Sequence, residues 1–102
     1  MRLPEEFRTP QATFRTWVRA SQARDEAAIR NCYWPDMPPE ELSAWLGENL
    51  SPQAERFFLG MELVRLEPVT LVEVNFYYRN AQGFEGRGVM VKTRAGWKLQ
   101  KF

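Results

Sequence analysis

The feature that most constrains the fold of this chain is a change of hydrophobic period close to Gly60. Before Gly60, apolar residues recur every three or four positions, a spacing that is typical of amphipathic helices. From Met61 onward, apolar and polar residues alternate, which is typical of strands with one buried face. A block of helices followed by a block of strands predicts an α+β domain. We expect three or four N-terminal helices packed on a curved, mainly antiparallel sheet of about four strands.

Length and composition are those of one ordinary domain spanning residues 1–102. The hydrophobic fraction of 44% and the charged fraction of 26% are close to the values of globular proteins. The longest apolar stretches are too short to cross a membrane, and the start of the chain lacks the apolar core of a signal peptide. We therefore expect a cytoplasmic protein that does not bind a membrane. An exported domain whose signal had been removed would have the same sequence.

Cap and stop signals delimit the helices. Thr9-Pro10 combines an N-cap residue with a proline at the first helical position, which predicts a helix over 10–23. Asp25 caps a second, shorter helix, and Trp34-Pro35 stops it, because a residue before proline avoids the helical conformation. Pro39 opens a third helix in the same way as Pro10.

The alternating part of the chain divides into strands at its turn signals. We expect strands over 61–66, 72–78, 84–93 and 97–102. Glu67-Pro68 is interpreted as a turn, because proline cannot donate a hydrogen bond within a sheet. Asn80-Ala81-Gln82-Gly83 and Arg94-Ala95-Gly96 are interpreted as hairpin loops.

The lengths of these loops predict which strand residues share a face. We expect Asn80 to lie opposite Gly83, and we expect a three-residue loop at 94–96 with Gly96 in the left-handed conformation. In this register the face that the helices must cover carries Val72, Val74, Val89, Val91, Trp97 and Leu99.

Three stretches resemble the nuclear-transport-factor-2-like superfamily, a cone-shaped α+β fold shared with ketosteroid isomerases, scytalone dehydratase and polyketide cyclases. They are Thr9-Pro10-Gln11-Ala12-Thr13-Phe14-Arg15-Thr16-Trp17 with the following residues to Ile29, the strand Val72-Glu73-Val74-Asn75-Phe76-Tyr77-Tyr78, and the ending Val89-Met90-Val91-Lys92 with Gly96-Trp97-Lys98-Leu99. The resemblance implies a long helix lying in a curved sheet, a cavity at the open end of the cone, and often a dimer through the outer face of the sheet.

If the resemblance holds, two groups of residues become candidate sites. The aromatic residues expected to converge near the mouth of the cone, as a pocket for an apolar ligand, are Trp17, Tyr33, Trp34, Trp45 and Phe76. The residues expected on the outer face of the sheet, as a homodimer interface, are Asn75, Tyr77, Met90 and Phe102.

The chain contains few side chains that could bind a metal or act as a nucleophile. The chain has no histidine and one cysteine, so neither a metal site nor a cofactor is expected. Cys32 lies on the apolar stripe of the second helix and is expected to be a small buried side chain.

Acid–base chemistry of the isomerase kind would need a carboxylate in an apolar pocket beside a hydroxyl donor. The candidate acids are Asp36 and Glu73, and the candidate donors are Tyr33, Tyr77 and Tyr78.

Charge is distributed unevenly although the net charge is only +1. Residues 35–78 carry two arginines against eight acids, a net charge of −6, and residues 79–102 carry six lysines and arginines against one acid, a net charge of +5. One interpretation is that acidic and basic strands neutralise each other across the sheet. The other is a two-pole surface that steers a charged protein partner. The basic strands hold few aromatic residues, so we expect no nucleic-acid binding.

The sequence therefore predicts a small, non-catalytic binding or interaction domain, homodimeric through the outer sheet face, with an apolar ligand or a protein as its partner. The alternative is an enzyme of the isomerase or cyclase type, which would act on a small hydrophobic substrate with a carboxylate and a tyrosine.

Overall fold

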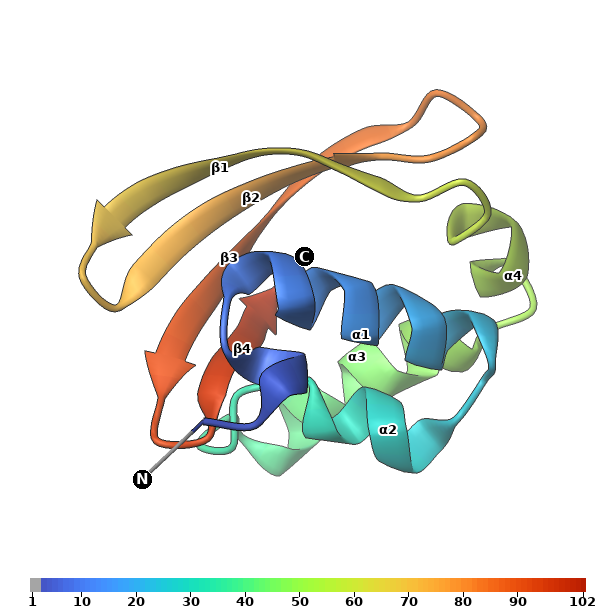
Figure 1. Ribbon diagram of the computed structural model, residues 1–102. Coiled ribbons are helices and arrows are strands. Elements are labelled where there is room, and N and C mark those ends of the chain that lie inside the picture. Colours follow the sequence, from blue (N-terminus) through green and yellow to red (C-terminus); the bar gives the residue numbers. More distant parts are fainter. Residues whose placement is uncertain (1–2) are drawn as a thin grey trace.

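Residues 3–102 are described by a computed structural model, in which helices lie on the concave side of a four-stranded antiparallel sheet (Figure 1). The elements are η1 (Glu5–Phe7), α1 (Pro10–Gln22), α2 (Glu26–Asn31), α3 (Pro39–Leu50), α4 (Ala54–Phe57), β1 (Glu62–Thr70), β2 (Glu73–Arg79), β3 (Glu85–Thr93) and β4 (Gly96–Lys101). The strands are hydrogen-bonded in the order β1-β2-β3-β4, which leaves β1 as an edge strand. The predicted α+β class, with helices before the sheet, is confirmed.

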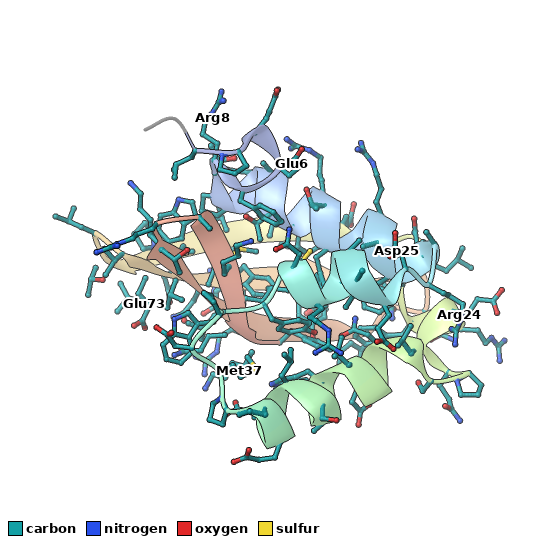
Figure 2. All side chains as sticks on the ribbon, turned by 90° about the horizontal axis from the view of Figure 1, so that it is seen from below. Glu6, Arg8, Arg24, Asp25, Met37 and Glu73 are labelled. Carbon is teal, nitrogen blue, oxygen red and sulfur yellow. The ribbon has the colours of Figure 1, made fainter. Side chains whose placement is uncertain are left out.

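The helix ends are fixed by the predicted side chains. The Thr9 hydroxyl accepts a hydrogen bond from the amide of Ala12 at 3.1 Å, and Asp25 caps α2 in the same way. After α1 the chain reverses at Arg24, whose φ of 54° is left-handed. The Arg24 guanidinium donates to the carbonyls of Leu50 and Ser51, so the end of α1 is tied to the end of α3 (Figure 2).

The predicted turn at Glu67-Pro68 is wrong, because β1 continues through Pro68 to Thr70. Pro68 pairs with Val74 of β2. An edge strand tolerates proline, since one side of its backbone has no neighbour that needs the missing N–H. The chain turns instead between Thr70 and Glu73.

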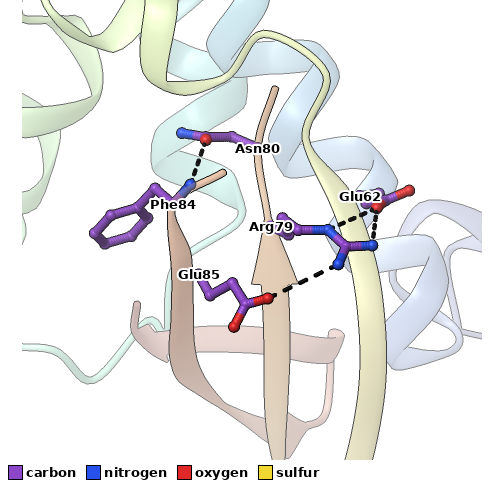
Figure 3. Close-up of polar contacts among 5 residues, drawn as sticks. All are labelled: Glu62, Arg79, Asn80, Phe84 and Glu85. Carbon is purple, nitrogen blue, oxygen red and sulfur yellow. Dashed lines mark hydrogen bonds and ion pairs between the residues drawn. The ribbon is translucent and has the colours of Figure 1, made fainter. Parts of the chain in front are cut away.

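The predicted register between β2 and β3 is wrong by one residue. Asn80 lies opposite Phe84, whose carbonyl accepts from the Asn80 amide at 3.0 Å, and Val74 therefore pairs with Met90 and not with Val89. The Asn80 side chain causes the longer loop, because its Oδ1 accepts from the amide of Gln82 and from the amide of Phe84, each at 3.0 Å. Figure 3 shows the contact with Phe84. Such a side chain replaces a backbone partner within a turn.

The loop between β3 and β4 also differs from the prediction. Thr93 pairs directly with Gly96, so the loop has two residues, and Val91 lies opposite Lys98 and not Leu99. Gly96 does take a positive φ, of 106°. A single irregularity between Val89 and Met90 changes the register again before Lys101.

Because of this register the inner face of the sheet carries a different set of residues. The side chains that contact the helices are Val74, Phe76 and Tyr78 from β2, Met90 from β3 and Leu99 from β4, each with at most 4% of its surface exposed. The predicted burial of Val74 and Leu99 is confirmed. The predicted burial of Val91 against the helices is wrong, because its partner position places it on the outer face, where it is half-buried.

Two glycines make room for rings on the inner face. A Cβ on Gly88 would lie 2.3 Å from the Phe76 ring and 2.5 Å from the backbone oxygen of Lys101, and one on Gly86 would lie 2.4 Å from the Tyr78 ring. Only glycine allows a ring to lie this close to the neighbouring strand.

We predict that Gly88→Ala lowers the free energy of unfolding by about 2–3 kcal/mol, the usual cost of overpacking. Gly47→Ala is the matched control: Gly47 lies in α3 with no atom within 4 Å of a built Cβ, and this change should raise stability by about 0.5–1 kcal/mol. Urea unfolding of the two variants measures both. A Gly88→Ala variant as stable as the parent would show that position 88 faces solvent and that the register is different.

Candidate functional site

The five predicted pocket residues do not surround an open cavity. Trp17 and Phe76 have no exposed surface, and they lie at the centre of the cone between α1 and the sheet. Phe14 and Phe58 close around the Trp17 indole in edge-to-face contacts, with centroid distances of 5.8 and 5.0 Å.

The mouth of the cone is occupied as well. Phe102, at the end of the chain, lies between Trp17 and Trp45, with ring centroids at 4.8 and 4.7 Å. A cleft of about 140 Å³ remains beside it, lined by Phe57, Phe58 and Phe102 among others. The interior that the resemblance assigns to a ligand is therefore filled by the chain's own aromatic rings.

Below these rings lies a buried polar cluster centred on Asn49 of α3, which is completely buried. Donors and acceptors around the amide define its orientation. Its nitrogen donates to the Trp45 carbonyl at 3.0 Å and to the Tyr33 hydroxyl at 2.5 Å. Its oxygen accepts from the Ser21 hydroxyl at 3.1 Å and from the Trp17 indole nitrogen at 3.2 Å. Asn49 thus uses its full hydrogen-bonding capacity and joins α1, α3 and the segment after α2.

Burial makes Cys32 and Tyr33 poor acids. Cys32 has no exposed surface, its thiol lies 3.3 Å from the Ala28 carbonyl, and desolvation raises its pKa from 9.0 to about 12. Desolvation also raises the pKa of Tyr33. Both groups stay protonated at neutral pH, so the expectation that Cys32 is a buried small side chain agrees with its place in the core.

The candidate acids and donors of the isomerase alternative do not meet. Asp36 is exposed in the loop before α3. Glu73, which is labelled in Figure 2, is half-buried at the start of β2. Tyr77 lies on the outer face, where its hydroxyl donates to Glu67 at 3.3 Å. Tyr78 lies on the inner face, on the other side of the same strand.

Two of the four predicted dimer residues are on the wrong side of the sheet. Met90 is completely buried and Phe102 contacts Trp17, so both belong to the interior. Met90 is misplaced by the one-residue error in the β2–β3 register, since such a slip moves every side chain to the other face. Phe102 is misplaced by the irregularity after Leu99, where an extra residue in β4 reverses the alternation of faces. Asn75 and Tyr77 do lie on the outer face, where β3 contributes residues that the sequence analysis assigned to the core.

A second depression, here named the side pocket, lies outside the aromatic interior. It has a volume of about 670 Å³ and is bounded by α2, the Trp34-Pro35 segment, Leu42 of α3, and Ala95 and Lys98 of the last hairpin. Tyr33 and Trp34, two predicted pocket residues, line it together. Lys98 was not among the predicted site residues, because a lysine on a strand is ordinarily solvated.

Within residues 3–102 no group of three metal-ligating side chains comes together, and no helix is long and apolar enough to cross a membrane.

No protein-family model matches the chain, and no curated protein matches it. Solved structures are similar to it, however. A Thiobacillus denitrificans protein described as a calcium/calmodulin-dependent protein kinase type II association domain superposes with a TM-score of 0.64 at 14% identity, over 91% of this chain and 90% of the other. An NTF-2 like protein of unknown function from Shewanella oneidensis MR-1 superposes with a TM-score of 0.52 at 14% identity, over 86% and 88%. The chain has the nuclear-transport-factor-2-like fold. The resemblance stated from the sequence is thereby confirmed at the level of the fold.

Within this nuclear-transport-factor-2-like fold, we predict that Asn49→Ala costs about 3 kcal/mol of unfolding free energy, since buried partners lose their hydrogen bonds. The control is Asn31→Ala, because Asn31 is an exposed asparagine at the end of α2, and it should change stability by less than about 0.5 kcal/mol. Thermal and urea unfolding measure the difference. An equal effect of the two substitutions would contradict the polar cluster.

A second prediction concerns pH and Cys32. Its pKa is higher in the folded chain than in the unfolded one, so its contribution to stability is complete below pH 9.0 and is lost as pH rises towards 12. The unfolding free energy should fall by up to about 1.4 kcal/mol per pH unit through this group. The decline should be shallower in Cys32→Ala, and the difference between the two profiles is the contribution of the thiol. Parallel pH profiles for the two proteins would be the contrary result.

Proposed function

We propose that this chain is a non-catalytic association domain that forms a homodimer through the outer face of its sheet. The observation that carries the proposal is the apolar centre of that face, where the half-buried side chains of Tyr77 and Val91 lie beside Val89, which is itself only 6% exposed. By the register, these side chains point away from the helices. An apolar centre surrounded by charged residues is the usual anatomy of a protein interface.

The rim of this face is charged and the central tyrosine is held in place. The rim residues are Arg65, Glu67, Glu73, Arg87 and Lys101. The Arg65 guanidinium lies 4.0 Å from the centroid of the Tyr77 ring, and Glu67 accepts from its hydroxyl. A ring whose rotamer is already fixed loses little entropy on binding, which favours Tyr77 as an anchor of the interface.

Charge on the sheet supports a second copy of this chain as the partner. At one end of the sheet, Arg79 pairs with Glu62 at 2.7 Å and with Glu85 at 3.8 Å, so part of the charge is neutralised within the chain (Figure 3). Charge differs across the rim: the β1 side carries Arg65 and Glu67, which offset each other, whereas the β3 and β4 side carries Arg87 and Lys101. A two-fold axis parallel to the strands would place β1 of one copy over β4 of the other, which keeps the two cationic sides apart and brings Glu67 towards Lys101.

The comparisons favour the same kind of role. The Thiobacillus denitrificans protein is described as an association domain, and the fold that it shares with this chain includes non-catalytic members as well as enzymes. The isomerase-type alternative gains no comparable support, because its candidate acids lie at the surface and the interior is filled with rings.

We predict that Tyr77→Arg and Val91→Arg each convert a dimer into a monomer at tens of micromolar protein, because an arginine at the centre of an apolar patch is desolvated without a partner. Leu59→Arg is the control, since Leu59 is 62% exposed between α4 and β1, away from this face. Sedimentation equilibrium measures the state of each variant. A monomeric parent protein, or a folded Tyr77→Arg dimer, would rule out this interface.

A further inference from the structure

The side pocket contains a buried lysine, Lys98, that forms no ion pair within the described part of the chain, although the more distant Glu6 carboxylate acts on its charge. Only 3% of Lys98 is exposed, its ammonium lies 3.4 Å from the centroid of the Phe7 ring, and it donates to the Asn31 carbonyl. Among residues 3–102, no carboxylate oxygen lies within 4.0 Å of this nitrogen. Burial accordingly lowers the pKa of Lys98. Buried lysines are rare in proteins unless they are paired, because desolvation of a charge is costly.

The walls around Lys98 complement a negatively charged ligand. No acidic side chain lines the side pocket, and its second cation is Arg30 of α2. Arg30 is exposed and only loosely paired with Glu26, at 3.4 Å, so it remains able to turn towards a ligand. The Asn31 side chain adds an amide at the rim.

The remaining lining is apolar. Trp34, Leu42 and Ala28 are among the lining residues and offer a surface for an apolar group. A volume of about 670 Å³ is in the usual range for a small-molecule site. A charged group beside apolar side chains can fix a ligand by its charged end while the apolar side chains cover its body.

We infer that the side pocket binds a small carboxylic acid with an aromatic or branched apolar body, with Lys98 as the charge partner of the carboxylate. The carboxylate restores to the ammonium the interaction that burial removes, through a charge-assisted hydrogen bond. Arg30 contributes a second, more exposed contact, and Trp34 covers the apolar body. This site is independent of the proposed homodimer, since none of its residues belongs to the apolar centre of the outer face.

Three probes of the same shape test the inference: phenylacetate, the neutral phenylethanol and the cationic phenylethylamine. Amide proton–nitrogen NMR spectra locate each probe and give its dissociation constant. We expect phenylacetate to bind roughly tenfold more tightly than phenylethanol, and phenylethylamine to bind most weakly. The shifts should be concentrated at Ala28, Asn31 and the Trp34 indole. Equal affinities for acid and alcohol, or shifts centred elsewhere, would overturn the inference.

Substitutions of Lys98 and Arg30 test which of the two cations binds the carboxylate of the ligand. Lys98→Met keeps the length of the side chain and should weaken phenylacetate binding roughly tenfold while leaving phenylethanol unchanged. Arg30→Gln, at an exposed position, keeps the test valid if Lys98→Met does not fold, and should weaken the acid several-fold. Arg19→Gln on the exposed side of α1 is the matched control and should have no effect. A folded Lys98→Met that retains the preference for the acid contradicts the assignment.

One further variant separates this site from the proposed dimer. Tyr77→Arg should bind phenylacetate with the parent affinity whether it is a monomer or a dimer. If it loses phenylacetate binding while remaining folded, the side pocket depends on the outer face and the independent site is refuted.

Discussion

The structure depends on the complete burial of one side chain, the indole of Trp17. It projects from the middle of α1 and contacts Phe58 after α4, Phe76 in β2 and Phe102 at the end of the chain. Its nitrogen, the one polar atom of the ring, donates to Asn49 of α3. Helices, sheet and C-terminus therefore meet on a single residue. An unpaired N–H at the centre of the core would cost free energy, so the hydrogen bond to Asn49 links the aromatic cluster to the polar cluster.

The helices were predictable because the signals that begin and end them lie within a few residues of each helix. The sheet register was predicted wrongly because it depends on contacts that the alternating pattern does not reveal. The caps at Thr9 and Asp25 act within four residues, and both form as the sequence indicates. The β2–β3 register depends on whether Asn80 faces Gly83 or Phe84, a choice that the Asn80 side chain decides through two hydrogen bonds. Either loop fits the alternating pattern, because a one-residue slip preserves alternation and exchanges only the faces. That exchange is why Met90 was expected on the surface.

The candidate site was predictable to a smaller extent. Aromatic abundance identified the residues that fill the cone, yet abundance alone does not distinguish a filled interior from a lined cavity. Trp17 and Phe102 exclude a ligand because they are in contact, and that contact joins residues 85 positions apart in sequence. Lys98 escaped notice for a similar reason. Its burial results from Phe7 and Asn31, which reach it from distant segments of the chain, and no pattern within β4 reveals them.

A filled interior also determines where this fold can bind anything. Rings that replace the cavity add buried apolar area, which a chain of 102 residues needs because a small domain buries little surface. The two binding surfaces proposed above, the outer face of the sheet and the side pocket, both lie outside this interior and are adjacent at one cross-strand pair. Val91 of the outer face lies opposite Lys98 of the side pocket. Cross-strand partners project from the same face of a sheet, so Lys98 would share the outer face with Val91 if Phe7 and Asn31 did not cover its ammonium. This cover separates the side pocket from the proposed interface, and it is the reason why the two proposed sites can act independently although they are neighbours in the β3–β4 ladder.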